Sequence, residues 1–288
     1  MSRGSEESEI GDLDIALAGR AAVDEVVERI LGDCLPGRID GSRALRQSIV
    51  LHVAAVVVVG GERRVLRINE QTPRSAVDYF LLNATRAWAD VVVTSGKIVR
   101  DEPELSFDLD GPSGVSASAL AAARAARTAV PLHVGVLSSG SGLSENLSVW
   151  QTEAAFTLIT SDGGKQESAQ WAAGAGVALQ ALDPVGPRAA VEWARDSAEP
   201  LGNAGEPGSR SNRVSVELGA RSSVHLYGNA SGEARPLVDV LALSEYDGPV
   251  PDPVVGEPFL PGIDLKRLYS PGPATSSGDW RFRMWSRR

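Results

Sequence analysis

Four stretches of the sequence end an apolar run on small or hydroxyl-bearing residues, and these stretches are where the chain could bind a ligand. They are Thr94-Ser95-Gly96, Ser138-Ser139-Gly140, Thr160-Ser161-Asp162-Gly163 and Leu218-Gly219-Ala220-Arg221-Ser222-Ser223. Small residues let a ligand approach the backbone, and free amides at helix starts favour phosphate groups. Gly and Ser after a strand also form plain turns, so each stretch alone is compatible with a turn. Their recurrence at equivalent places favours a nucleotide site.

The sequence lacks the residues, or the spacing between them, that a metal site or a nucleophilic active site would need. The three histidines, His52, His133 and His225, are not at metal-ligand spacing, and no metal site is expected. A single cysteine, Cys34, excludes a disulfide framework within the chain and the His/Cys zinc signature of nucleobase deaminases. Neither a GxxxxGK[ST] phosphate loop nor a GxSxG elbow is present. We therefore expect binding by backbone and small side chains rather than by a metal or a nucleophile.

Composition narrows the class of protein. The formal net charge of -9 argues against a general nucleic-acid binder, which would normally show a basic footprint. No apolar run approaches the roughly 18 residues of a membrane span. The N-terminus, "MSRGSEESEIGDLDI", is acidic and lacks the features of a secretory signal. With only one cysteine, a reducing compartment is the natural interpretation, and we expect a cytoplasmic protein.

Strands and helices alternate along most of the sequence. Apolar and β-branched runs predict strands at 48–59, 63–68, 91–94, 131–139, 154–161, 177–182, 214–218 and 235–246, and a half-exposed terminal strand at 279–288. Helical spacing and propensity predict helices at 12–32, 74–88, 117–128, 166–173 and 187–198. This order predicts an α/β fold: a mainly parallel, twisted sheet with helices on both faces and an antiparallel C-terminal edge.

Local residues place the boundaries of these elements. Gly60-Gly61 predicts a hairpin turn, and Thr72-Pro73 predicts the cap and first residue of the 74–88 helix. Residues 1–10 read as disordered and 199–213 as a flexible loop. The expected organisation is an N-terminal tail and helix (1–45) followed by one domain (46–288).

The segment "TPRSAVDYFLLNATRAWADVVVTSGKIVRDEP", residues 72–103, resembles a known family. It is similar to the reductase domain of bifunctional riboflavin-biosynthesis deaminase-reductases and to stand-alone diaminopyrimidine reductases, which share the dihydrofolate reductase-like fold. The family pattern is "LRAxADAVLVGAGTVRADDP". Further landmarks follow in order: "PLHVGVLSSGSGL", "FTLITS", "VSVELGARSSVHL" and "PLVDVLAL". The resemblance spans about residues 48–285.

The resemblance implies an NADPH-dependent oxidoreductase that transfers hydride to a small heterocyclic or sugar-like substrate, such as a ribosylaminopyrimidine phosphate, and that forms a homodimer. It implies nicotinamide near Thr94, Ser95 and Gly96, with Gly96 allowing close approach. The other implied cofactor residues are Lys97 and Asp101 beside the ligand, Thr160 and Ser161 at the adenosine ribose or its phosphate, and Leu218, Gly219, Ala220, Arg221 and Ser222 at the pyrophosphate. Thr72 and Glu102 are the candidates on the substrate side, and no residue is assigned as the proton donor.

The chain also departs from the family pattern. The usual "SLDGK" turn is "VVVVGGERR", and the threonine of "GTVRADD" aligns with Lys97. The double glycine of "VEGG" becomes Leu218-Gly219, and the substrate arginine that usually follows "DDP" is missing from "ELSFDLDG". These changes leave two alternatives open: a reductase for another substrate, and a catalytically degenerate protein acting as a nucleotide-binding regulator or structural subunit.

Overall fold

A computed structural model describes residues 8–9, 23–33, 35–41, 45, 47–102, 104–109, 114–196, 212–228 and 235–288. The strands are β1 (Ser8–Glu9), β2 (Ile49–Val59), β3 (Glu62–Leu66), β4 (Val91–Ser95), β5 (His133–Leu137), β6 (Ala155–Thr160), β7 (Ala178–Ala181), β8 (Arg213–Glu217), β9 (Val240–Tyr246), β10 (Val255–Pro258), β11 (Tyr269–Ser277) and β12 (Trp280–Arg287). The helices are α2 (Val23–Leu31), α3 (Ala76–Trp88), α4 (Gly96–Asp101), α5 (Gly114–Arg127), α6 (Asp162–Ala175), α7 (Pro187–Asp196), α8 (Ala220–Ser223) and α9 (Leu265–Leu268). Short 3-10 turns are η2 (Ser148–Gln151), η3 (Val224–Leu226) and η4 (Asp252–Val254).

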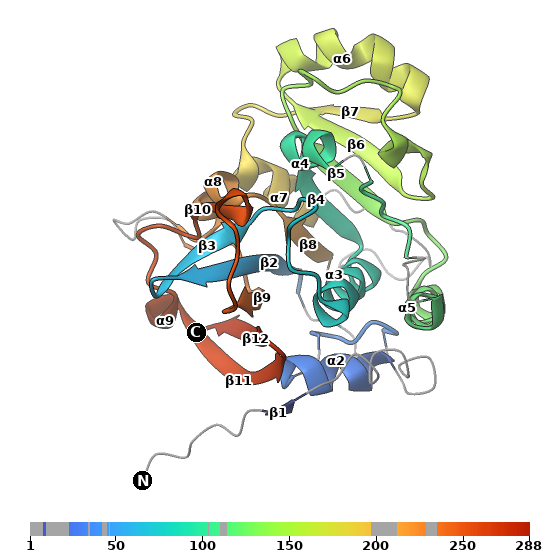
Figure 1. The fold of residues 1–288 in the computed structure, drawn as a ribbon. Helices are drawn as coiled ribbons and strands as arrows, with labels where there is room; N and C mark the ends of the chain where they lie inside the picture. Colours follow the sequence, from blue (N-terminus) through green and yellow to red (C-terminus); the bar gives the residue numbers. More distant parts are fainter. Residues whose placement is uncertain are drawn as a thin grey trace.

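All the described strands form one 12-stranded sheet, in the order β1-β11-β12-β9-β2-β8-β4-β5-β6-β7, with β3 and β10 branching from β2 (Figure 1). The path from β9 through β2, β8, β4, β5 and β6 to β7 is parallel. β12 runs antiparallel to both β9 and β11. The predicted fold class is therefore confirmed, including the antiparallel C-terminal part.

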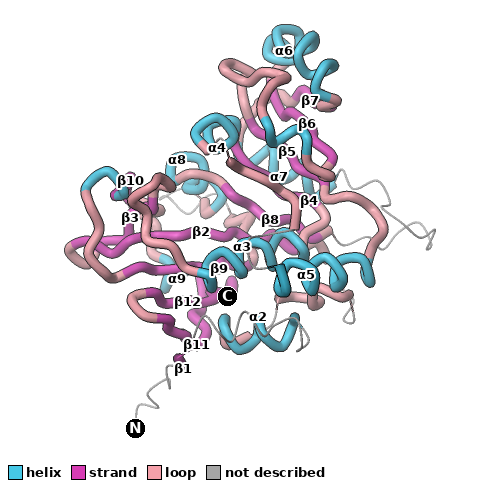
Figure 2. Tube along the Cα trace, turned by 45° about the vertical axis from the view of Figure 1, so that its right-hand side comes forward, coloured by secondary structure: helices cyan, strands magenta, loops and turns pink. Residues whose placement is uncertain are grey.

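Helices cover both faces of the sheet, as Figure 2 shows from a second direction. One buried cluster contains Trp88 and Phe80 of α3, Val27 and Ile30 of α2, and Val92 of β4. The other contains residues of α7 and α9 packed on Val91, Val93 and Val216. Because side chains alternate along a strand, the valine runs supply both clusters at once, which explains their continuous apolar character.

The hairpin between β2 and β3 follows from its two glycines. Val59 pairs with Glu62, so Gly60 and Gly61 form a two-residue loop. Their φ angles are 58° and 82°. Positive φ at both central residues is the requirement of the type I′ turn, which matches the twist of the flanking strands. The hairpin predicted from the sequence is confirmed.

The N-terminal helix joins the same core as the sheet. Val23–Leu31 is helical, whereas 10–22 and Cys34 lie outside the described residues. The buried carboxylate of Asp24 accepts a hydrogen bond from the backbone N–H of Ile39 at 2.8 Å, which fixes the segment after the helix. Ser8 and Glu9, expected to be disordered, instead pair with β11, because its outer edge offers free backbone groups.

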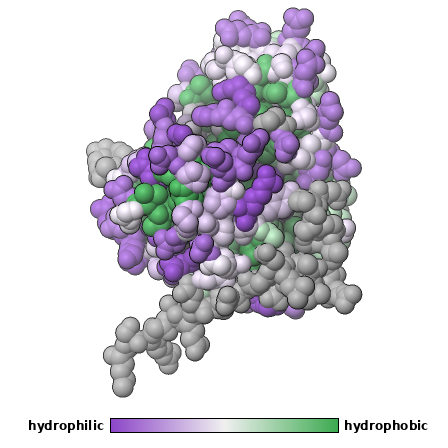
Figure 3. Space-filling model, in the orientation of Figure 1, coloured by the Kyte–Doolittle hydropathy of each residue, from purple (hydrophilic) through white to green (hydrophobic). Residues whose placement is uncertain are grey.

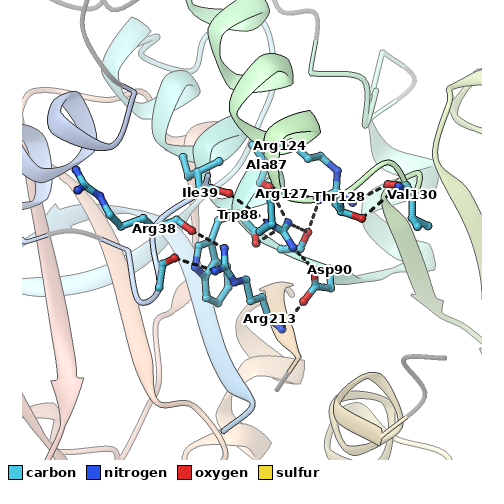
Figure 4. A network of polar contacts seen from close by, with 12 residues as sticks. Arg38, Ile39, Ala87, Trp88, Asp90, Arg124, Arg127, Thr128, Val130 and Arg213 are labelled. Atoms are coloured by element: carbon cyan, nitrogen blue, oxygen red, sulfur yellow. Dashed lines mark hydrogen bonds and ion pairs between the residues drawn. The ribbon is translucent and has the colours of Figure 1, made fainter. Parts of the chain in front are cut away.

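A polar network holds the amino ends of β4 and β8 (Figure 4). Asp90 accepts from the side chain of Arg127 and, at 3.0 Å, from the backbone N–H of Arg213. Arg127 also donates to the last carbonyls of α3, where a cation suits the helix dipole. The indole N–H of Trp88 donates to the carbonyl of Pro36 at 2.7 Å. This network fixes where the two strands start and thus the level at which they end.

The predicted half-exposed terminal strand is confirmed: Trp280, Phe282 and Met284 of β12 are at most 6% exposed, whereas Arg281 and Ser286 on the other face are exposed. β12 is not an edge of the sheet, however, because it lies between β11 and β9. The predicted cap of α3 is wrong. The cap of α3 is Ser75, whose hydroxyl accepts from the N–H of Asp78 at 3.2 Å. Thr72 instead closes its own turn. Most of the predicted 199–213 loop lies outside the described residues, and Arg213 already begins β8.

Candidate functional site

The carboxyl ends of β8, β4, β5 and β6 meet at one edge of the sheet. Thr94 lies beside Glu217, and Ser95 beside Leu137, which in turn pairs with Ile159. The four stretches singled out in the sequence therefore come together along this edge, which we call the carboxyl edge. In open α/β sheets this is where ligands bind. The structure thus brings together every predicted cofactor residue, although their contact with a cofactor stays a prediction.

The glycines of the carboxyl edge fall into two groups. A Cβ at Gly96 would lie 2.5 Å from the Cβ of Ser138, and one at Gly164 would lie 2.7 Å from the carbonyl oxygen of Ser139. Protein packing alone requires glycine at these two positions. A Cβ at Gly219 would meet no atom within 4 Å, and one at Gly163 would reach only the Ser161 hydroxyl at 4.0 Å. The backbone open to a ligand is therefore at Gly163 and Gly219, and Gly96 has a steric role that needs no ligand.

Two buried hydroxyls at the carboxyl edge lack a partner. Thr94 and Thr160 are both 0% exposed, and neither Oγ1 has a hydrogen-bond partner among the described residues. A buried hydroxyl without a partner costs about 1–3 kcal/mol, so such atoms call for an explanation. Both residues were predicted at the cofactor site from the sequence.

Several of the predicted cofactor residues already have structural partners. Ser95 caps α4 through a 3.3 Å bond from the N–H of Ile98, and Ser161 caps α6 through a 3.2 Å bond from the N–H of Gly164. Lys97 and Asp101 form an i,i+4 ion pair with side chains 76% and 52% exposed. Exposed pairs of this kind contribute little to stability. These contacts leave room for a ligand without requiring one.

The segment after β8 combines buried and exposed residues. The side chain of Leu218 is buried in the core, and Ala220 is 9% exposed. Ser222 donates its N–H to the carbonyl of Gly219 at 3.0 Å. Arg221 is 87% exposed and pairs with Glu257 of β10, its Nε donating at 2.9 Å. A phosphate that used Arg221 would share it with Glu257.

The hydroxyl of Thr72 has two partners within its own turn, and its contact with a substrate stays a prediction. Its Oγ1 donates to the carbonyl of Arg67 at 2.7 Å and accepts from the N–H of Asn69 at 2.7 Å. Both contacts are made within the turn before α3. Glu102, the other predicted substrate residue, ends α4 at the carboxyl edge.

A buried ion pair lies next to Glu102. Arg86 of α3 holds Glu217 through two parallel bonds, Nε to Oε1 at 2.8 Å and Nη2 to Oε2 at 2.7 Å, with side chains 4% and 9% exposed. Arg86 also donates to the carbonyl of Ser106 at 2.9 Å and lies 4.6 Å from the ring of Phe107. Glu217 sits on the same face of the sheet as the unpaired Thr94.

Burial raises the pKa of Glu102 from 4.5 to about 7. The charge of Glu217 and, to a lesser extent, that of Asp101 act in the same direction, whereas Arg86 and Lys97 oppose the rise. Burial also raises the pKa of Asp78 in the first turn of α3, where Ser244 is its hydroxyl partner. Sequence analysis named Glu102 but not the Arg86–Glu217 pair beside it. Arg86 and Glu217 lie 131 positions apart, so no spacing pattern in the sequence connects them.

Metal-ligand clusters and membrane-length helices are both absent from the described residues. No cluster of three His, Cys, Asp or Glu side chains in that part of the chain is arranged to hold a metal ion. None of its helices combines the length and apolar composition needed to cross a membrane.

Figure 3 shows polar side chains over most of one face, with a compact apolar area where Figure 1 places β3 and β10.

No protein-family profile matches the sequence, and no curated protein matches it either. Solved structures do match. RibD of Acinetobacter baumannii is 11% identical with a TM-score of 0.55, over 86% of this chain and 60% of that one. A pyrimidine reductase-like protein from Corynebacterium diphtheriae is 16% identical with a TM-score of 0.57, over 86% of this chain and 96% of that one.

A deaminase/5-amino-6-(5-phosphoribosylamino)uracil reductase from Thermotoga maritima is 13% identical with a TM-score of 0.53, over 84% of this chain and 57% of that one. The chain thus spans about three fifths of the length of the first of these structures. The resemblance noted in the sequence is confirmed at the level of architecture: the chain has the fold of the riboflavin-biosynthesis reductases.

Proposed function

We propose that the protein is an NADPH-dependent reductase that delivers hydride to the carbonyl or imine carbon of a small sugar-like or heterocyclic substrate, of the ribosylaminopyrimidine phosphate class. The observation that carries the proposal is the position of Glu102 beside the buried Arg86–Glu217 pair, at the edge where the predicted cofactor residues meet. Burial there raises the pKa of Glu102 to about 7. The reductases of the same fold support the class of reaction.

The residues of the carboxyl edge fit a dinucleotide. Gly163 and Gly219 leave open space beside their backbone, and Thr94 and Thr160 carry hydroxyls without partners. The start of α6, a helix of 14 residues, suits a phosphate or ribose group. We assign the pyrophosphate to Gly219 and the exposed Arg221. Bound NADPH would supply the hydride.

Hydride addition to a carbonyl or imine leaves an oxygen or nitrogen that must gain a proton. A general acid works best with a pKa near the working pH, and Glu102 meets that condition. Arg86 holds Glu217 in place, and the charge of Glu217 disfavours ionisation of Glu102. In this proposal Glu102 donates the proton, and the charge of Glu217 keeps Glu102 protonated at a higher pH.

The test is NADPH oxidation with a ribosylaminopyrimidine phosphate as substrate. Glu102→Gln should lower turnover by about 10²–10⁴-fold, the usual contribution of a general acid, with NADPH affinity unchanged. Glu104→Gln is the matched control, because Glu104 is exposed two positions along the chain. Full turnover in Glu102→Gln would remove Glu102 from the mechanism, and no turnover in the unaltered protein would refute this substrate class.

A homodimer and a cytoplasmic location belong to the same proposal. The dimer rests on the resemblance alone, because β12 lies inside the sheet and offers no exposed edge. The location rests on the single cysteine. Sedimentation at micromolar concentration should give a dimer, and a monomer would reject that part.

A further inference from the structure

A chain of buried hydrogen bonds lies under the segment after β8, on the sheet face opposite Glu217. His52 of β2 is 0% exposed. Its Nδ1 lies 2.8 Å from the hydroxyl of Tyr227, and its Nε2 lies 3.2 Å from the hydroxyl of Ser223. The Ser223 hydroxyl in turn lies 2.8 Å from the carbonyl oxygen of Leu218 and 3.1 Å from that of Gly219.

The donors in this chain can be assigned from chemistry. Carbonyl oxygens only accept, so the single proton of the Ser223 hydroxyl goes to Leu218 or Gly219. Ser223 must then accept from His52, which places the imidazole proton on Nε2. Nδ1 is left as an acceptor for the Tyr227 hydroxyl. The bonds therefore run in one direction, from Tyr227 through His52 and Ser223 to the backbone beside Gly219.

A serine beside a histidine suggests a nucleophile and its base, but this pair is unsuited to that role. Ser223 and His52 are both 0% exposed, so no substrate atom can reach the hydroxyl. The hydroxyl proton is committed to a carbonyl rather than to the imidazole. Burial lowers the pKa of His52 to about 4, so the ring is neutral at ordinary pH and holds one tautomer.

The hydrogen-bond chain ends at Gly219, where the backbone of the carboxyl edge is open. Gly219 has free space where a side chain would be, and its carbonyl accepts from the N–H groups of Ser222 and Ser223, both at 3.0 Å. Its helix α8 has only four residues and is too short to hold its shape by its own hydrogen bonds. The Ser223 hydroxyl lies nearest the carbonyl oxygen of Leu218, at 2.8 Å, and a bond to that oxygen holds the Leu218–Gly219 peptide and so sets where the Gly219 N–H points.

We propose that His52 is a positioning residue: through Ser223 it holds the Leu218–Gly219 backbone in the conformation that receives the phosphates of a dinucleotide. This inference rests on the proposed function for its ligand. Tyr227 acts one step further back by holding the His52 ring. No member of the chain touches the cofactor or substrate.

The test uses three single variants that each remove one hydroxyl. Ser223→Ala and Tyr227→Phe each interrupt the chain of hydrogen bonds, one on either side of His52. Tyr269→Phe is the control, because its hydroxyl donates to the carbonyl of Val238 at 2.8 Å in the same core, without reaching Gly219. Amide hydrogen exchange of 219–223 without cofactor is measured alongside NADPH affinity and unfolding free energy. His52→Leu is added for a complete break.

Ser223→Ala and Tyr227→Phe should speed exchange at 219–223 and weaken NADPH binding at least fivefold, while Tyr269→Phe loses comparable stability and changes neither. Equal NADPH affinity in all variants would overturn the inference and leave the proposed function standing. Unchanged exchange in Ser223→Ala would also overturn it. If the unaltered protein fails to bind NADPH, the proposed function itself falls, and the positioning role falls with it.

Discussion

Replacing Glu102 by glutamine is expected to stabilise the folded protein in alkaline solution, although the same change removes its proposed catalytic proton. Glu102 ends α4 close to Glu217 and Asp101, with Arg86 and Lys97 only partly compensating. Burial and the neighbouring carboxylates disfavour its charge, so its folded pKa is raised. Glutamine is nearly the same shape and carries no charge at any pH.

The magnitude follows from the two pKa values. A rise from 4.5 to about 7 corresponds to about 3 kcal/mol at full burial. Because the side chain is only partly buried, we expect about 1–3 kcal/mol. The protonated carboxyl contributes its full stability below pH 4.5, and this is lost as the pH rises towards 7. The advantage of Glu102→Gln should therefore be small near pH 5 and reach its full value near pH 8.

Urea denaturation at about pH 5 and about pH 8 measures this difference directly. Glu104→Gln serves again as control and should show no pH-dependent gain, since Glu104 is exposed. A stability difference between the unaltered protein and Glu102→Gln that is the same at both pH values would refute the reasoning. Such a result would mean that Glu102 has the pKa of an ordinary surface carboxyl and is ionised at neutral pH.

Three further substitutions test the same edge. Arg86→Met should cost about 3–5 kcal/mol of unfolding free energy because it leaves the buried Glu217 carboxylate without its partner. Adding Glu217→Leu should recover most of this loss. Gly96→Ala should cost about 1–3 kcal/mol by overpacking against Ser138, and Ser138→Gly should restore stability. Gly219→Val should change stability by less than about 1 kcal/mol yet abolish NADPH binding. Urea denaturation and NADPH titration check all three. The ion-pair argument would be contradicted if the effects of Arg86→Met and Glu217→Leu were additive. The overpacking argument would be contradicted if Ser138→Gly did not restore the stability lost in Gly96→Ala. Intact NADPH binding in Gly219→Val would contradict the placement of the cofactor.

The sheet could be predicted from the sequence because its strands carry strong local patterns. The valine runs at 53–59 and 91–93 are too short for helices and rich in β-branched residues, and Gly60-Gly61 allows little besides a tight hairpin. The parallel order then follows from the helices between the strands. The carboxyl edge could be predicted for the same reason, since parallel strands end together.

Contacts between distant residues could not be predicted in this way. β12 alternates basic and apolar residues as an edge strand would, but it lies between β9 and β11, a position that only the pairing with these two strands reveals. Likewise, nothing in the sequence shows that Ser138 packs against Gly96 and leaves no space there for a side chain. The choice of Ser75 over Thr72 as cap depends on the turn at Asn69, which holds the Thr72 hydroxyl.

The most direct measurement for the central claim is a titration of the purified protein with NADPH, followed by NADH. A dinucleotide site at Gly163 and Gly219 predicts saturable NADPH binding with a dissociation constant between about 1 μM and 1 mM, the usual range for enzyme substrates. It further predicts that Gly219→Val loses this binding while remaining folded. Saturation by neither dinucleotide would contradict the account, because the carboxyl edge would then carry no cofactor and Glu102 would have no hydride transfer to complete.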